Sequence, residues 1–198
     1  MKVRTHMAMG QTVACLLSFV GSAVAIEVNP TQTQIQTALD RGRQAAVQHQ
    51  APQTFYTRFG GDDPAQPNGF LVTKLGGLSV VATHMALRGL EPSPADVAQV
   101  IEAPTMLVSA TIIGESPSFA ENSYMVLDQE GRVIKPLTVK ADGRADRRTG
   151  QSASPEFHAK VIATFRYADF DPKARTTITI FPAHGGEIHF PLNFADIE

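Results

Sequence analysis

Apolar and polar positions alternate along the second half of the chain, which is the pattern of a half-buried β-strand. The alternation is clearest from Phe157 to Tyr167, where only Ile162 breaks it. Five further apolar or β-branched runs are separated by turn residues, at Met106–Ile113, Tyr124–Leu127, Val133–Val139, Thr176–Pro182 and Glu187–Phe194. Strands at this spacing predict an antiparallel β-sandwich over residues 105–198, immunoglobulin-like in general form.

The last two runs predict a hairpin whose register follows from its apolar positions. A two-residue Gly185-Gly186 turn would place Ile178 opposite a polar residue. A three-residue turn that also includes His184 pairs Ile178 with Leu192 instead, and it keeps the apolar side chains on one face. We therefore expect the three-residue turn, with a glycine at positive φ.

The first half of the chain carries helical periodicity. A first helix shows an apolar stripe made of Ile35, Ala38, Leu39 and Ala46. We expect Asn29 to cap this helix and Pro30 to occupy its first position. A second helix is expected from about Leu78, because Gly76-Gly77 interrupts the apolar spacing just before it.

A third helix is predicted to end at Ile101. Ser93 has the side chain of an N-cap, Pro94 suits the first turn, and Asp96 lies near the positive end of the helix dipole. The predicted fold class is therefore α+β. A helical or mixed segment over residues 26–104 precedes the sandwich.

The first 25 residues have the three parts of a secretory signal peptide. Lys2 and Arg4 are basic, residues 12–20 are apolar, and Ala23-Val24-Ala25 is an A-x-A cleavage motif. The apolar run is shorter than the roughly 18 residues that a membrane span needs, so we expect the segment to be removed. The working protein would then begin near Ile26 and act in the periplasm or outside the cell.

The single cysteine, Cys15, lies within this segment. A lipid-bearing cysteine needs its apolar region upstream, whereas most of the apolar region here follows Cys15, so cleavage after Ala25 is favoured over lipidation. Removal of the segment leaves 173 of the 198 residues and no cysteine, which excludes disulfides and cysteine chemistry there. A chain of that length can bury one sizeable core or two small ones.

The charge of the chain argues against a nucleic-acid partner. Without Lys2 and Arg4, 15 of the 17 basic residues remain against 19 acidic ones, a net charge of −4. No second apolar run has the length and composition of a transmembrane segment. Residues 140–154 lack large apolar side chains and include four basic residues, so we predict a mobile loop that could dock an anionic partner.

Three potential metal ligands lie close together in the last hairpin: His184, Glu187 and His189. Imidazole and carboxylate groups suit zinc or copper, and strand alternation places Glu187 and His189 on one face. The expected turn puts His184 away from that face. A polar outer sheet face is the alternative interpretation of the same residues.

One short segment, Gly114-Glu115-Ser116-Pro117-Ser118, resembles part of the nucleophile elbow of hydrolases. It lacks the last glycine of that motif, and Pro117 removes a backbone N–H that an oxyanion hole would use. No dinucleotide fingerprint or phosphate-binding loop accompanies it. The favoured function is therefore that of an exported, soluble, non-catalytic protein that binds an envelope or extracellular protein. A periplasmic metal-binding protein is the second interpretation, and an envelope hydrolase is the third.

Overall fold

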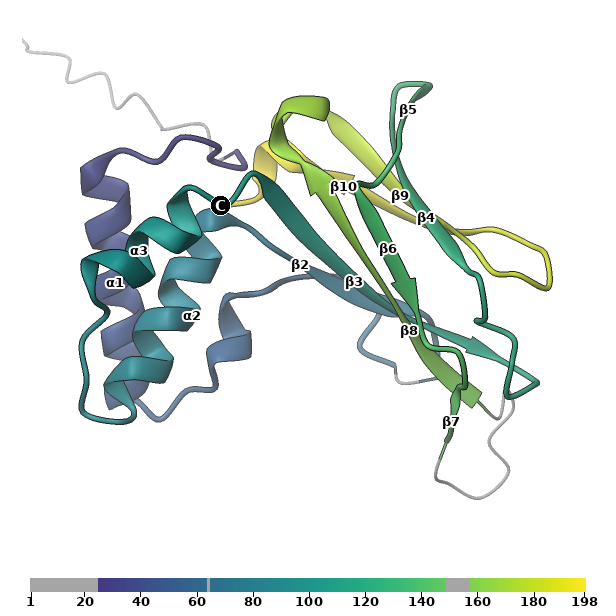
Figure 1. Ribbon diagram of the computed structural model, residues 1–198, viewed down its shortest axis with the longest axis horizontal. Coiled ribbons are helices and arrows are strands. Elements are labelled where there is room, and N and C mark those ends of the chain that lie inside the picture. The colour runs from purple at the N-terminus through teal and green to yellow at the C-terminus, as the bar shows by residue number, and fades with distance from the viewer. Residues whose placement is uncertain (1–24, 64, 149–156) are drawn as a thin grey trace, which may run out of the picture.

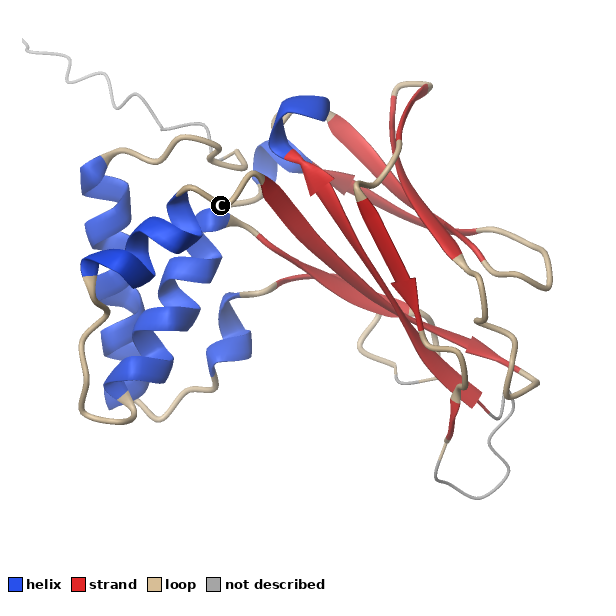
Figure 2. Ribbon diagram, viewed as in Figure 1, coloured by secondary structure: helices blue, strands red, loops and turns tan. Residues whose placement is uncertain are grey.

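Two antiparallel sheets lie face to face, and the helices gather at one end of them (Figure 1, Figure 2). This computed structural model describes residues 25–63, 65–148 and 157–198. The helices are α1 (Gln32–Val47), α2 (Lys74–Ala86) and α3 (Pro94–Ile101), with short 3₁₀ turns at Pro52–Phe55, Tyr167–Asp169 and Phe194–Asp196. Residues 1–24 of the predicted signal peptide lie outside the described residues. Within the described residues, no helix combines the length and apolar character that crossing a bilayer requires.

The larger sheet has the strand order β1-β2-β3-β8-β6, with β7 also paired to β8. Its strands are β1 (Thr57–Gly60), β2 (Asn68–Val72), β3 (Thr105–Gly114), β6 (Thr138–Ala141), β7 (Asp146–Arg147) and β8 (Phe157–Arg166). The smaller sheet has the order β10-β9-β4-β5. Its strands are β4 (Tyr124–Gln129), β5 (Arg132–Ile134), β9 (Arg175–Phe181) and β10 (Ile188–Asn193).

The main core lies between the two sheets. Val108 and Val161 of the larger sheet and Leu127 and Ile178 of the smaller one belong to the same buried cluster, and all four are fully buried. Burying such side chains contributes about 1.5–3 kcal/mol each relative to leaving them exposed. The arrangement confirms the predicted α+β class with a C-terminal β-sandwich. The immunoglobulin-like form stays a prediction.

Two strands of the larger sheet come from the first half of the chain. β2 pairs along its whole length with β3, and β1 continues the sheet beyond it. Phe59 of β1 is buried in the main core, where its ring lies 4.9 Å from that of Phe190. Phe59 therefore anchors this segment of the chain to the sandwich. The sheet thus joins the predicted helical or mixed segment to the predicted all-β segment.

The helices α1 and α2 pack closely over small residues and form a second, smaller core. Ser79 Oγ donates to the Ala38 carbonyl at 2.8 Å, and Thr83 Oγ1 donates to the Gly42 carbonyl at 3.0 Å. Both pairs advance by four residues, so the two helices run in the same direction. A Cβ on Gly42 would lie 2.4 Å from the Ser79 carbonyl oxygen. Only glycine permits the backbones to approach this closely.

The helix starts differ from three of the predictions, and Pro30 lies before the N-cap of α1 and not at its first position. Thr31, and not Asn29, caps α1, because its hydroxyl accepts from the Gln34 N–H while the Gln34 side chain accepts from the Thr31 N–H. α2 begins at Lys74, before the predicted start at Leu78, and so includes both glycines in its first turns. The third helix is confirmed, with Ser93 as its N-cap and a capping box to Asp96.

The register of the last hairpin also differs from the prediction. Ile178 pairs with Phe190 and Ile180 with Ile188, so the register is shifted by two residues from the three-residue turn. The chain turns through residues 182–187, and both Gly185 and Gly186 have positive φ. A shift of two preserves the side-chain alternation, so the predicted apolar face still points to the core.

The predicted strand Val133–Val139 is divided between the two sheets. β5 ends at Ile134 in the smaller sheet and β6 begins at Thr138 in the larger one, with Pro136 between them. Proline lacks the N–H that a continuous ladder needs. The predicted loop 140–154 is also wrong in its described part, because residues 140–141 and 146–147 pair with β8 and Ala145 is buried. Residues 149–156 lie outside the described residues.

Candidate functional site

The predicted metal ligands of the last hairpin divide into a pair and a single residue. Glu187 Oε2 lies 3.1 Å from His189 Nε2, and His189 Nδ1 lies 3.2 Å from the hydroxyl of Thr179. His184 lies in the turn and is exposed. Across the described residues, no three His, Cys, Asp or Glu side chains gather as a metal-binding group. The described residues therefore provide one carboxylate–imidazole pair, and zinc or copper binding there stays a prediction.

The fold brings the candidate nucleophile Ser116 next to this hairpin. Ser116, His184 and Glu187 line one pocket of about 450 Å³, although they are far apart in sequence. The Ser116 Oγ atom is buried and has no hydrogen-bond partner. A nucleophile has to reach its substrate, so this orientation of the hydroxyl does not favour hydrolysis.

The ends of α1 and α2 expose three large aliphatic side chains far from the sandwich. Val47 is 80% exposed, Leu87 50% and Leu90 52%. The hydrogen bond from Thr83 to Gly42 places these two residues side by side on the parallel helices. Leu87 is four residues beyond Thr83 and Val47 is five residues beyond Gly42, so the two lie at similar positions along the helix axes. Figure 1 shows both helices ending on the same side of the molecule. We call Val47, Leu87 and Leu90 the helical-end surface.

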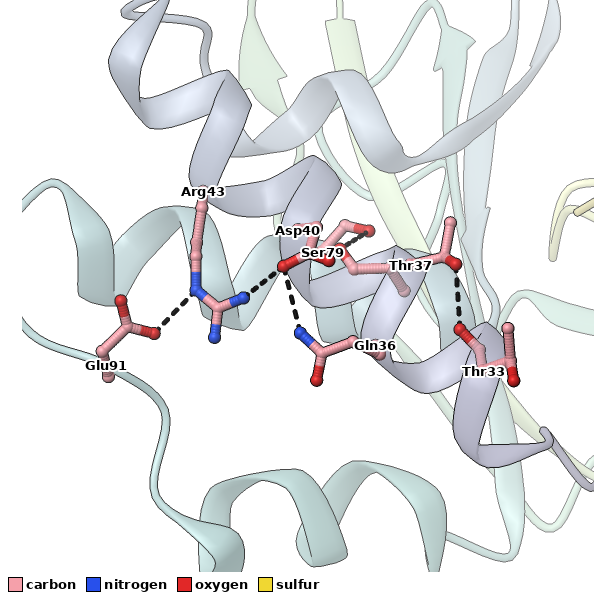
Figure 3. A network of polar contacts seen from close by, with 8 residues as sticks. Thr33, Gln36, Thr37, Asp40, Arg43, Ser79 and Glu91 are labelled. Carbon is pink, nitrogen blue, oxygen red and sulfur yellow. Dashed lines mark hydrogen bonds and ion pairs between the residues drawn. The ribbon is translucent and has the colours of Figure 1, made fainter.

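Charged residues border the helical-end surface, and their ion pairs link α1 to the segment that follows α2. The Arg43 guanidinium pairs with Asp40 on α1 and, at 2.7 Å, with Glu91 beyond α2 (Figure 3). Gln36 adds a hydrogen bond of 3.0 Å to the same Asp40 carboxylate (Figure 3). The hydrogen bond to Glu91 is the main cause of a raised pKa of Arg43. An apolar centre with a charged border is the general composition of a protein–protein contact surface.

A pocket of about 410 Å³ lies where α2 and α3 meet the larger sheet, and we call it the junction pocket. Its apolar wall is made of Val72, Val80, Val81, Val100 and Leu107. Three ionisable residues also line it: Lys74, Asp96 and Tyr167. Its volume falls within the range of roughly 300–1,000 Å³ that is common for small-molecule sites.

Burial and hydrogen bonding shift the pKa values of the three ionisable residues of the junction pocket. Lys74 is buried, its amine donates to the Ile101 carbonyl at the end of α3, and it lies 5.1 Å from the centre of the Tyr167 ring. Burial lowers the pKa of Lys74 and raises the pKa of Tyr167. The Ser93 side chain, followed by the Ser93 backbone, lowers the pKa of Asp96 by hydrogen bonding. Groups with shifted pKa values are concentrated at functional sites more often than elsewhere.

Sequence reasoning did not identify the junction pocket. Lys74 stands at the start of a helix that was expected to begin later, and Tyr167 begins the 3₁₀ turn that follows β8. Their proximity depends on the packing of α2 against the sheet. A lysine inside an otherwise apolar run was the one available signal in the sequence.

Comparison with known proteins gives little further information. No family model and no curated protein sequence matches the chain. Two solved structures from Sulfolobus acidocaldarius align with 46% of this chain at 16% identity and a TM-score of 0.28. They are the archaellum periplasmic stator protein complex FlaF and FlaG, covered over 78% of its chain, and the stator protein FlaG alone, covered over 87%. This similarity is too low to transfer a function, a location or a partner to this chain.

Proposed function

We propose that this protein is an exported, non-catalytic interaction protein that binds a partner protein of the cell envelope or medium through the helical-end surface. The observation that carries the proposal is the exposure of Val47, Leu87 and Leu90 at the same end of α1 and α2. Single exposed aliphatic residues are common on protein surfaces, but three of them at one end of a helix pair, beside charged residues, have the composition of a contact surface. Covering these three side chains would remove apolar area from water, which favours association.

Photo-crosslinking at the proposed surface tests this function. A crosslinking amino acid is placed at Leu87 in the full-length protein, and at Val133 in a matched control, since Val133 is also exposed but lies on β5. We expect a defined crosslinked partner in the envelope or medium fraction of the source cells from position 87 and none from position 133. The same partner from both positions, or none from position 87, would contradict the proposal.

A double substitution, Val47→Ser with Leu90→Ser, gives an independent measurement. Both side chains are largely exposed, so the variant should keep the stability of the parent within about 0.5 kcal/mol. We expect the amount of co-purified partner at moderate salt to fall at least about tenfold, the equivalent of about 1.4 kcal/mol. Undiminished recovery of the partner would remove the helical-end surface from the proposal.

Export is the second part of the proposal, and it is supported by the signal-peptide pattern of residues 1–25. Cell fractionation with intact-mass analysis tests it. We expect a chain that begins near Ile26 in the periplasm or medium. A chain that retains Cys15 with added acyl mass would establish a lipoprotein instead.

Metal binding at the last hairpin is a second candidate function. The contact of Glu187 with His189, and the nearby His184, favour zinc or copper as the metal. Elemental analysis of tag-free protein tests it, with His189→Ala as the comparison. One equivalent of metal that is lost in the variant would support this function, whereas substoichiometric metal in both proteins would argue against it.

A further inference from the structure

The junction pocket places a positive charge against an apolar wall without an acidic partner. The Lys74 amine has the Ile101 carbonyl and the Tyr167 ring as neighbours. Among the residues that the structure describes, no carboxylate lies within ion-pair distance of this amine. Buried ammonium groups are usually paired, because an isolated buried charge is unfavourable.

The acidic residue of the pocket does not supply this charge. Both Asp96 contacts go to the start of α3, where its carboxylate accepts from the Ser93 N–H at 2.8 Å and from the Ser93 hydroxyl at 2.7 Å. The Asp96 carboxylate is therefore engaged in the capping box of α3. The Lys74 ammonium has three N–H donors, and the Ile101 carbonyl takes one of them.

The helix that carries Lys74 adds to the positive potential. Lys74 is the first residue of α2, directly after the N-cap Thr73, so the positive end of the helix dipole lies at the same edge of the pocket. Further along α2, Val80 and Val81 line the same pocket, together with Val100 of α3. These neighbours favour a ligand with a negative group at one end and an aliphatic body at the other.

We propose that the junction pocket binds an aliphatic monocarboxylate, with the carboxylate paired to Lys74 and the chain packed against the valines of α2 and α3. The hydrogen bond to the Ile101 carbonyl and a bond to the ligand can coexist on one ammonium group. Binding would add a charge-assisted hydrogen bond to an ammonium group whose neighbours are otherwise the Ile101 carbonyl and the Tyr167 ring. The partner-binding function at the helical-end surface is a separate matter, and neither proposal requires the other.

Calorimetric titration of the full chain with octanoate tests this site, with octanol as the uncharged probe. Lys74→Met removes the charge while keeping an unbranched side chain, and Val81→Phe fills the apolar part of the pocket. We expect one octanoate per chain, affinity weaker by roughly tenfold or more for octanol and for Lys74→Met, and no binding to Val81→Phe. Thermal unfolding of each variant establishes that it is folded.

A second readout follows the lysine itself. Saturating octanoate should raise the pKa of Lys74, measured from the ¹³C shift of its ε-methylene group, since a carboxylate favours the ammonium form. Equal affinity for octanol and octanoate, or unchanged affinity in Lys74→Met, would overturn the assigned role of the lysine. Absence of octanoate binding would leave Lys74 as a structural cap of α3 and overturn the proposal.

Discussion

At the residue scale, α1 and α2 end in the same backbone motif with different residues. Gln50 N–H donates to the Ala45 carbonyl after His49, and Leu90 N–H donates to the Met85 carbonyl after Gly89, which are the bonds of Schellman motifs. Gly89 has a φ of 71°, which glycine adopts without strain, and His49 has a φ of 55°, which a residue with a Cβ rarely adopts.

This difference predicts opposite effects for two substitutions. Gly89→Ala should lower the free energy of unfolding by about 1 kcal/mol, because no atom lies within 4 Å of the added Cβ and only the backbone strain remains. His49→Gly should raise it by up to about 1 kcal/mol. Urea unfolding measures both. A stabilising Gly89→Ala would show that the left-handed conformation is not required there.

The buried phenol of Tyr167 predicts a dependence of stability on alkaline pH. Burial raises the pKa of Tyr167 above its ordinary value of 10.0. The neutral phenol therefore contributes fully to the stability of the fold below about pH 10, and this contribution is lost as the pH rises further. Lys74 has a pKa below its ordinary value of 10.5, so its contribution to the stability of the fold increases as the pH rises toward 10.5. Comparison with Tyr167→Phe isolates the phenol.

Urea midpoints measured between about pH 9 and 11 check this prediction. We expect the stability of the parent protein to decline more steeply than that of Tyr167→Phe above about pH 10, and the variant to lack a late-titrating tyrosinate absorbance. Parallel pH profiles for the two proteins would mean that the phenol ionises equally in the folded and unfolded states.

At the element scale, the contact of α1 with α2 depends on Gly42. Gly42→Ala would force the helices apart at a cost of about 1–3 kcal/mol, which exceeds the roughly 1 kcal/mol that alanine contributes through helix propensity. We expect a net loss of up to about 2 kcal/mol in urea unfolding. Gly143→Ala is the matched control, since Gly143 has no atom within 4 Å of an added Cβ. Equal effects of the two substitutions would contradict the close contact.

At the scale of the whole molecule, the last residues connect the helices to the sandwich. Phe194 is fully buried and packs edge-on against Phe170. The Thr73 hydroxyl at the start of α2 donates to the backbone oxygen of Glu198 at 2.9 Å. The Glu198 side chain pairs with Arg41 of α1 at 2.7 Å. The C-terminal end of the chain therefore lies where the helices meet the sandwich (Figure 1).

Two substitutions separate these contributions. Phe194→Ala should lower the free energy of unfolding by about 3–5 kcal/mol, because it leaves a cavity in the main core. Glu198→Gln should lower it by less than about 1 kcal/mol, because its ion pair with Arg41 is partly exposed. Thermal unfolding followed by circular dichroism measures both. A small effect of Phe194→Ala would show that the last turn contributes little to the core.

Local signals in the sequence determined most of the elements. Alternation between Phe157 and Tyr167 predicted β8, and the Asp128–Gly131 segment contains the turn between β4 and β5, where Glu130 and Gly131 both have positive φ. Ser93 and Asp96 predicted the start of α3. Each of these features depends on residues within a few positions of one another, so the sequence alone specifies it.

What only the tertiary structure decided are the relations between distant segments. The pairing of β2 with β3, the division of residues 133–139 between two sheets, and the meeting of Lys74 with Tyr167 all depend on packing across the fold. Glycines that interrupt a helical pattern in sequence are required where backbones approach closely, as at Gly76 beside the Phe55 carbonyl. The sequence by itself determined the α+β class and the apolar faces, because these follow from periodicity. The junction pocket was decided by tertiary structure, because no local pattern records which surfaces will meet.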